Sequence, residues 1–524
     1  MKKKAIAAAL SSLLVLSMGT AAFAADSQSS TEITATIEGG YTVTIPTSID
    51  LGTVGAEDFA PKPMQTTEYG VFEEDYQYMV DTDFDIKVDG WYADNQYVKV
   101  TTDKIATLTD SGSEATVPVT VYPYERAFDE AATKTSTVTL YKDDAQPGDF
   151  TGTATFDIEL VTYDPQTGIK MGLYNNAFKT DDYAVAAFGS TDSEHIAALA
   201  EMGYEAAYGF NADLYAEMNE KGIEIAGANT MSAIPGNEAY DSYSTAEKIV
   251  ASAKYYKEQG YSFENFDYSY YPFGMFTEGI DSYEAYAEKW EAGIESAVQM
   301  NKELEQAAQD LGYGEIDFWL TQENEPMGQP GQSALEVAMF INCVQHASDE
   351  AGVKNYMKVS VDLVHAYSFL NLELEPRAVT QQYCVDYMET QDWAKMLFYN
   401  SPYFEQELKI QIPETIEQYM SLLDGQVSVI QFSDNNGSTK SPFGEGKGSA
   451  TGSHHVIGEG RIDYLEYMDA LCNIAHMTDL GSYWVYEPWY NQNNETTQQN
   501  LVQGIRDGVM WMTEWNLLYA VDTL

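Results

Sequence analysis

Basic residues are scarce in this chain of 524 residues. Lysine and arginine together number 27, against 82 aspartates and glutamates, which gives a formal net charge of −55. A surface with this charge repels phosphate backbones and anionic lipid headgroups. The composition therefore argues against nucleic acid as a partner and favours solubility outside the cell.

Cysteine is almost absent, and long hydrophobic runs are missing after the first residues. Cys343, Cys384 and Cys472 are far apart and odd in number, whereas a disulfide framework needs an even, dense set. We expect buried free thiols. No internal segment approaches the roughly 20 apolar residues of a membrane-spanning helix, so no transmembrane segment is expected.

The first residues have the pattern of an export signal. Three lysines at positions 2–4 precede the apolar run Ala5–Leu16, and Ala22–Ala24 offers small residues at the −3 and −1 positions of a cleavage site. This order is typical of a secretory signal peptide. We expect residues 1–24 to be removed, and the mature protein to be secreted or held at the cell surface.

Residues 25–165 predict a small all-β sandwich, because they contain segments that alternate apolar and polar residues between Asp, Gly and Pro clusters. The expected strands are Tyr41–Pro46, Phe84–Tyr92, Ala115–Tyr124, Thr135–Tyr141 and Gly152–Tyr163. The stretches "IPTSIDLGTV" and "GDFTGTATFDIEL" resemble the Ig-like modules of secreted Gram-positive bacterial proteins. That resemblance implies a spacer, adhesion or carbohydrate-binding role, with association at the cell surface.

Residues 166–524 predict an α/β fold, a (β/α)8 TIM barrel, because short apolar runs alternate there with helical patterns. The expected strands are Ile169–Tyr174, Tyr204–Tyr208, Ile223–Ala228, Glu264–Tyr270, Ile316–Gln322, Met357–Asp362, Val427–Phe432 and Tyr483–Glu487. The expected helices include Glu194–Met202, Ser282–Leu311, Ala334–Ala351, Asp463–His476 and Gln498–Leu518.

Polar residues mark the ends of the last four expected barrel strands. Glu323 follows the fifth strand, Asp362 and Glu487 end the sixth and the eighth, and Gln431 is the second-last residue of the seventh. Chemistry in a TIM barrel takes place at these strand ends, and carboxylates that converge there repel unless a cation neutralises them. One acid at a strand end is more often structural, but three on neighbouring strands predict a divalent metal site, with Mn, Mg or a similar ion.

Three stretches resemble the xylose isomerase-like TIM barrels, in particular the sugar phosphate isomerase/epimerase group. They are "TQEN", "VSVDLVHAY", and "DNNG" followed by "HHVIGEGRIDYLEYMDAL" and "GSYWVYEPW". The resemblance implies that Glu323, Asp362 and Glu487 bind the metal and that His365 contacts the substrate. It also implies that Glu323 and Glu487 move a proton next to a carbonyl of a carbohydrate.

The rim offers further candidates and one departure from that group. Arg461 and His455 stand in the glycine-rich turn and Trp489 follows the last strand, where they are candidate substrate contacts. His454 is a candidate of the same kind, although an ordinary loop role is the simpler interpretation for this turn. The group usually places a histidine ligand on the seventh strand, where this chain has Gln431.

Two other functions stay open at this point. "ENEP" contains Asn-Glu-Pro, which is similar to the acid/base motif of retaining glycoside hydrolases, and Glu325 with Glu487 would then be the catalytic pair. The third possibility is a carbohydrate-binding surface protein without catalysis. Bound metal would favour the isomerase-like function, whereas two carboxyl groups about 5–5.5 Å apart without metal would favour a retaining hydrolase.

Overall fold

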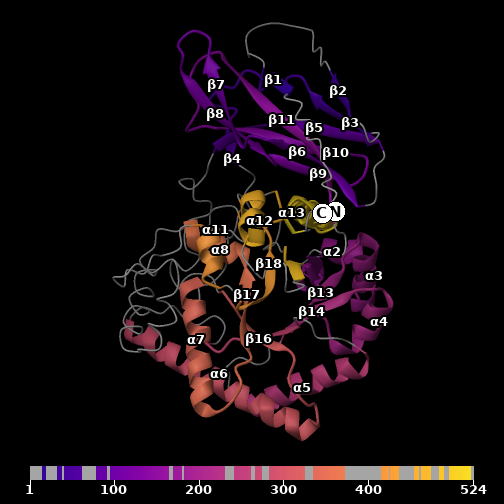
Figure 1. Cartoon of the computed structure of the whole chain (residues 1–524), viewed down its shortest axis with the longest axis vertical. Helices are drawn as coiled ribbons and strands as arrows, with labels where there is room; N and C mark the ends of the chain where they lie inside the picture. The colour runs from indigo at the N-terminus through magenta and orange to yellow at the C-terminus, as the bar shows by residue number, and fades with distance from the viewer. Residues whose placement is uncertain are drawn as a thin grey trace, which may run out of the picture. The chain divides into compact units, whose positions relative to one another are not determined.

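A computed structural model describes most of the chain (Figure 1). The described residues are 14–18, 32–37, 41–61, 78–90, 95–163, 169–179, 182–229, 241–260, 266–273, 283–324, 334–371, 415–423, 425–435, 454–458, 462–473, 483–488 and 495–520. Contacts divide the chain into two compact units. The β unit comprises Met1–Thr66, Gly70–Gly168 and Trp511–Leu524, and the barrel unit comprises Thr67–Tyr69 and Ile169–Met510.

The β unit is built from antiparallel strands. Their order is β2-β3-β5-β10-β8-β7-β11-β6-β9, with β1 on β11 and β4 on β5. The strands are β1 (Leu14–Met18), β2 (Glu32–Ile37), β3 (Tyr41–Pro46), β4 (Ala60–Pro61), β5 (Tyr78–Gly90), β6 (Gln96–Thr102), β7 (Ile105–Asp110), β8 (Thr116–Tyr122), β9 (Glu125–Phe128), β10 (Ala132–Tyr141) and β11 (Phe150–Thr162).

The strands form two layers around one core, as the alternating pattern predicted. Strand β11 pairs first with β7 and then with β6, so the sheet folds over on itself. Phe84 of β5 and Phe156 of β11 meet edge to face in the core, with ring centroids 6.1 Å apart. All five expected strands are present, and β1, β2, β4, β6, β7 and β9 are additional. Strand β1 lies inside the expected signal peptide, whose removal stays a prediction.

A buried ion cluster ties residues from the end of the chain into the β unit. Glu514, 4% exposed, accepts hydrogen bonds from Arg126 Nη1 at 2.9 Å and from the Ala127 N–H at 3.0 Å. The ammonium of Lys134 lies 3.3 Å from the same carboxylate. Burial lowers the pKa of Lys134, and the attraction of Glu514 opposes that shift. Glu514 thus compensates two cations that are largely shielded from water.

Glu514→Gln should destabilise the β unit by about 3–5 kcal/mol, because it leaves buried cations without a counter-charge. Glu125→Gln is the matched control. Glu125 bonds the Tyr519 hydroxyl at 2.9 Å and Lys99 at 3.0 Å, and it is more exposed than Glu514. Glu125→Gln should lower the free energy of unfolding by less than about 1 kcal/mol. Urea unfolding followed by circular dichroism measures both, and equal losses would contradict the assigned role of Glu514.

The barrel unit is a closed barrel of parallel strands, β12 to β19 in sequence order, as the sequence predicted. Strand β12 pairs with both β13 and β19, which closes it. The strands are β12 (Lys170–Tyr174), β13 (Ala206–Tyr208), β14 (Glu224–Asn229), β15 (Asp267–Ser269), β16 (Trp319–Glu323), β17 (Met357–Asp362), β18 (Val427–Phe432) and β19 (Tyr483–Tyr486).

Helices surround the barrel, with α5, α6 and α7 along its outside (Figure 1). They are α1 (Asn176–Lys179), α2 (Asp182–Phe188), α3 (Asp192–Met202), α4 (Tyr215–Glu220), α5 (Ser242–Glu258), α6 (Tyr283–Leu311), α7 (Ala334–Ala351), α8 (Leu363–Asn371), α11 (Ile416–Ser421), α12 (Tyr464–Asn473) and α13 (Glu495–Trp515). A short 3-10 helix covers Ala212–Leu214 and a π-helix covers Asn516–Ala520. A search of the described residues found no helix with the length and apolar character to span a membrane.

The sequence explains why the barrel packs as it does. All six residues of β18 are buried, as expected for a strand covered on both faces. Helix α3 begins with a capping box, in which Thr191 and Glu194 each satisfy a backbone N–H of the other. The closed barrel places the carboxyl ends of its strands in a ring, and Glu323 and Asp362 stand at two of these ends.

Candidate active site

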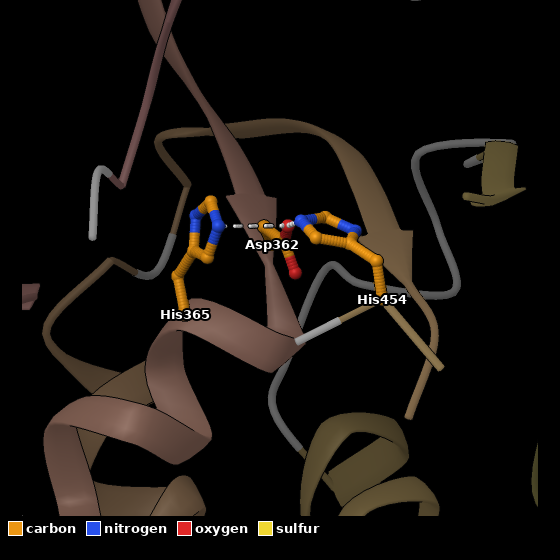
Figure 2. Close-up of side chains that lie close together, drawn as sticks. All are labelled: Asp362, His365 and His454. Carbon is orange, nitrogen blue, oxygen red and sulfur yellow. Dashed lines mark ion pairs between the residues drawn. The ribbon is translucent and has the colours of Figure 1, made fainter. Parts of the chain in front are cut away.

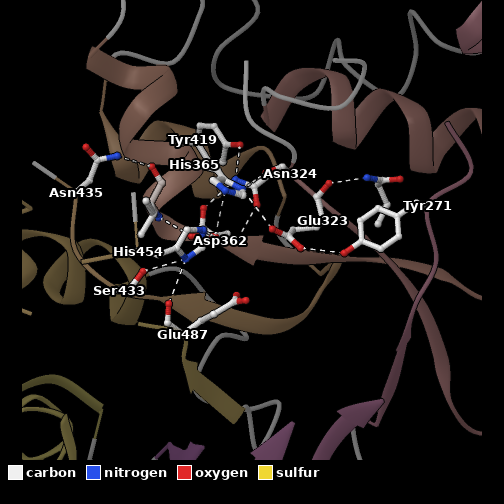
Figure 3. A network of polar contacts seen from close by, with 12 residues as sticks. Tyr271, Glu323, Asn324, Asp362, His365, Tyr419, Ser433, Asn435, His454 and Glu487 are labelled. Atoms are coloured by element: carbon white, nitrogen blue, oxygen red, sulfur yellow. Dashed lines mark hydrogen bonds and ion pairs between the residues drawn. The ribbon is translucent and has the colours of Figure 1, made fainter. Parts of the chain in front are cut away.

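The carboxyl ends of β16 to β19 bring their polar residues to one side of the barrel mouth (Figure 3). Glu323 is the last residue of β16, Asp362 is the last of β17, and Glu487 directly follows β19. The strands are neighbours in the barrel and run in the same direction. Their terminal side chains therefore face a common space at this end of the barrel.

Asp362, His365 and His454 form the densest part of this region (Figure 2). One ligand atom from each lies within 4.8 Å of the others, and the three residues are 1%, 6% and 3% exposed. The Nε2 atoms of His365 and His454 lie 3.5 and 3.6 Å from Asp362 Oδ2. His365 comes from the first turn of α8, whereas His454 comes from the turn before α12.

The hydrogen bonds of the two rings decide where their protons lie. His365 Nδ1 contacts the carbonyl oxygen of Asn324 at 2.8 Å, and His454 Nδ1 contacts that of Glu487 at 3.1 Å. A carbonyl oxygen only accepts, so Nδ1 carries the proton in both rings. In its neutral form, each ring then directs an Nε2 lone pair toward Asp362.

Asp362 completes a set of acceptors that suits a cation. Its Oδ1 accepts from the Val364 N–H at 2.7 Å, while its Oδ2 is buried and has no hydrogen-bond partner among the described residues. The Nε2 to Oδ2 distances match the edge of about 3.4 Å expected between tetrahedral ligands with bonds of about 2.1 Å. The backbone carbonyls behind both rings are the usual outer partners of metal-binding histidines. These residues fit a divalent metal ion.

Two further carboxylates adjoin this cluster. Glu323 Oε1 lies 3.2 Å from His365 Nδ1, and Glu323 Oε2 accepts a hydrogen bond from the Tyr271 hydroxyl at 3.2 Å. Burial raises the pKa of Glu487 well above its usual value, and repulsion from Glu323 and then Asp362 adds to the rise. All three carboxyl groups stand at the carboxyl ends of the adjoining strands β16 to β19. The site thus contains more negative charge than its two histidines balance.

Burial also dominates the electrostatics of the inner residues. It raises the pKa of Asp362 to about 6, an effect that nearby His365 opposes and Glu323 reinforces. Burial lowers the pKa of His454 well below 6.5, with a smaller contribution from His365. His454 is therefore neutral at physiological pH, which is the form that binds metals.

Asn324, which directly follows β16, fixes the geometry of the cluster through its hydrogen bonds. Its side-chain oxygen accepts from the Asp362 N–H at 2.6 Å, and its amide nitrogen donates to the Asp362 carbonyl at 2.9 Å and to the Tyr419 hydroxyl at 3.2 Å. One fully buried side chain thus satisfies both backbone groups of Asp362, while its own carbonyl orients His365.

The opposite side of the mouth is aromatic. Tyr174 and Tyr208, the last residues of β12 and β13, stack with ring centroids 5.0 Å apart. The Tyr208 hydroxyl lies 2.5 Å from the hydroxyl of Ser269, which ends β15. Among the described residues of the mouth, the carboxylates Glu323, Asp362 and Glu487 lie in the half formed by β16 to β19.

Four residues named from the sequence, Glu323, Asp362, His365 and Glu487, lie on this side of the barrel mouth, and their chemical roles stay predictions. Gln431 is the backbone partner of Asp362 on β18, and its side-chain oxygen is buried without a hydrogen-bond partner in the described residues. The histidine that faces Asp362 is His454, for which an ordinary loop role is the simpler interpretation from sequence.

The remaining candidates lie beside this cluster or outside the described residues. His455 is buried next to His454 but does not belong to the three-residue group, and burial lowers its pKa to about 4. Arg461, Trp489 and Glu325 lie outside the described residues. Asp463 caps α12 through the Glu466 N–H at 3.3 Å.

Asp362→Asn should stabilise the metal-free protein at neutral pH. Because the pKa of Asp362 is raised to about 6, its favourable contribution is complete below pH ~4 and is lost as the pH rises through 6. Asparagine cannot ionise, so in EDTA at pH 7.5 the free energy of unfolding of the variant should exceed that of wild type by up to about 3 kcal/mol. The free energies of unfolding of the two proteins should become equal near pH ~4.

Urea unfolding at both pH values, in EDTA and in Mn²⁺, measures this difference. With Mn²⁺ the order should reverse, because only wild type retains the anionic ligand and gains stability from binding. Identical curves for the two proteins in EDTA at all pH values would contradict the assignment of Asp362 as a buried, destabilising carboxyl group.

No protein-family model matches the chain. No curated protein matches it either. Among solved structures, the chain is similar to a D-psicose 3-epimerase crystallised with D-fructose (11% identity, 66% of this chain and 98% of that chain covered, TM-score 0.38). It is also similar to a D-tagatose 3-epimerase-like protein, with 13% identity, 66% of this chain and 97% of that chain covered, and a TM-score of 0.35. A third similarity is to a xylose isomerase domain protein from Alicyclobacillus acidocaldarius, with 12% identity, 66% of this chain and 98% of that chain covered, and a TM-score of 0.36.

Proposed function

We propose that the barrel unit is a metal-dependent isomerase or epimerase that transfers a proton next to the carbonyl of a carbohydrate. One observation carries the proposal: Glu323 and Glu487 adjoin a buried group of acceptor atoms from Asp362, His365 and His454. Two carboxyl groups beside a cation site are the parts that proton abstraction from a carbon next to a carbonyl requires.

Asp362, His365 and His454 would hold the metal, with Glu323 and Glu487 close enough to join them. Two imidazoles favour a first-row transition ion such as Mn²⁺, Co²⁺ or Zn²⁺ over Mg²⁺ or Ca²⁺. When bound, the ion polarises substrate oxygens and offsets the negative charge that develops as the proton leaves.

The two glutamates would handle the proton. Glu323 is oriented by Tyr271 and His365, and in the carboxylate form it serves as the base. Burial raises the pKa of Glu487 well above its usual value, which suits a residue that returns a proton. The exchange of roles in the reverse reaction follows from microscopic reversibility.

Sugars fit this chemistry because a hydroxyl and a carbonyl on adjacent carbons supply both the oxygens for a cation and the acidic C–H. The same proposal includes export of the mature chain, with release from the cell or retention at the cell surface. The β unit then serves as a spacer or as a carbohydrate-binding or surface-binding module.

Reaction in D₂O tests the proposed function. Protein loaded with Mn²⁺ and incubated with ketoses or aldoses should incorporate deuterium at the carbon next to the carbonyl, because the carboxyl that returns the proton exchanges with solvent. Mass spectrometry and NMR of the recovered sugars detect the label, and EDTA should abolish it. Metal-independent cleavage of a glycoside, without deuterium at that carbon, would replace this proposal with the retaining hydrolase that uses Glu325 and Glu487.

A further inference from the structure

One buried aspartate holds the turn that carries His454. Asp434 is 2% exposed and follows β18, and residues 435–453 separate it in sequence from the turn that begins at His454. Its backbone forms an antiparallel bridge with His455, in which each N–H donates to the carbonyl of the other at 2.8 Å. This bridge anchors the turn at the residue next to His454.

The side chain of Asp434 binds the rest of the same turn. Its Oδ2 accepts from the Gly458 N–H at 2.9 Å, and its Oδ1 accepts from the N–H groups of Ile462 at 3.2 Å and Asn435 at 2.8 Å. A carboxylate that gathers three backbone donors forms charge-assisted hydrogen bonds that an aliphatic side chain cannot replace. The turn therefore folds around Asp434.

His454 requires this support because its backbone conformation is unusual. Its φ is +63°, in the left-handed region that residues with a Cβ seldom adopt unless their surroundings impose it. In this conformation Nδ1 donates to the Glu487 carbonyl and Nε2 faces Asp362 (Figure 2). A change in the backbone angles of His454 would turn the ring away from Asp362.

We propose that Asp434 is a positioning residue, which holds His454 in the conformation that completes the metal site and does not itself contact the metal. The inference rests on the proposed function for the presence of the metal and deepens it by naming what sets the third ligand. The polar, glycine-containing turn before α12 then serves the barrel mouth as well as the helix.

Co²⁺ titration of four proteins tests the inference: wild type, Asp434→Ala, His454→Ala and the double variant. Asp434→Ala should lower the Co²⁺ affinity roughly 10- to 100-fold, and the visible spectrum of bound Co²⁺ should change toward that of His454→Ala. The double variant should bind no more weakly than His454→Ala alone, because Asp434 acts only through His454. Independent, additive losses would overturn the inference.

Asp463→Ala is the matched control, since Asp463 lies in the segment that leads into α12 but caps the helix through the Glu466 N–H. It should leave the Co²⁺ affinity within a factor of about two, as expected for a site with no shared partner. If Asp434→Ala fails to fold, Asp434→Asn, which keeps one acceptor oxygen, should give a smaller loss in the same direction. A variant that folds and binds Co²⁺ like wild type overturns the inference.

A second readout needs no metal. In ¹⁵N NMR of the metal-free protein with labelled histidines, His454 should carry its proton on Nδ1 in wild type and in Asp463→Ala, and should become a mixture of tautomers in Asp434→Ala. An unchanged His454 tautomer overturns the inference whether or not metal binds. If these results hold and no sugar is converted, the proposed function fails and the role of Asp434 stands.

Discussion

His454→Ala should reduce the affinity of the protein for Mn²⁺ and Co²⁺ by about 100-fold or more. The side chain supplies one of the two imidazole nitrogens that face Asp362 Oδ2, and removing a ligand costs at least as much as removing an outer partner. Isothermal titration calorimetry at constant pH measures the change. His346→Ala is the control, because His346 lies on the outer helix α7 and pairs with Glu350.

The same titration decides between His454 and Gln431 as the ligand next to Asp362. Gln431 is a predicted metal ligand, and its side chain, with a buried oxygen, belongs to the residue that pairs with Asp362 in the strand register. If Gln431→Leu weakens Mn²⁺ binding more than His454→Ala does, the strand amide is the principal ligand and the loop histidine is secondary. A wild-type protein that binds neither Mn²⁺ nor Co²⁺ would contradict the metal site as a whole.

Glu487→Gln should abolish any interconversion of ketoses and aldoses and should also weaken Mn²⁺ binding. The substitution removes a group that carries the proton and a negative charge that interacts with Glu323 and Asp362. A loss of a general acid or base costs on the order of 10²- to 10⁴-fold in rate. Steady-state assays with the sugars that take up deuterium provide the measurement, with the metal content determined in parallel.

Glu325→Gln is the informative comparison, because Glu325 is the acid/base residue of the competing hydrolase mechanism. It should leave Mn²⁺ binding and sugar interconversion close to wild type. Loss of glycoside cleavage in Glu325→Gln, with no dependence on metal, would establish the hydrolase and reject the isomerase-like mechanism.

Much of the barrel and half of its site followed from local sequence patterns. The apolar run Met357–Asp362 became β17 with the same limits, and its terminal acid lies where parallel strands place their last side chain. Glu323 and Glu487 were predicted on the same grounds. A strand has a period of two and a defined end, so its terminal residue is set by the chain itself.

His454 and Asn324 could not be placed in this way. The position of His454 depends on the Asp434–His455 bridge and on a φ of +63°, and no local pattern specifies either. Asn324 was visible as a neighbour of Glu323, but its bonds to both backbone groups of Asp362 exist only once β16 and β17 pair. Strand β9 was missed because it is short and contains Arg126, which is buried only in the company of Glu514.

The Arg126–Glu514 pair has a consequence for synthesis. The two residues are 388 positions apart, so Arg126 and Lys134 leave the ribosome long before the acid that neutralises them. Contacts between distant residues form late, and until then the β unit holds unmatched cations. A product that stops short of residue 514 would keep that defect permanently, open readily and be degraded by proteases. We therefore expect chains truncated before residue 514 to have a less stable β unit than the full-length chain.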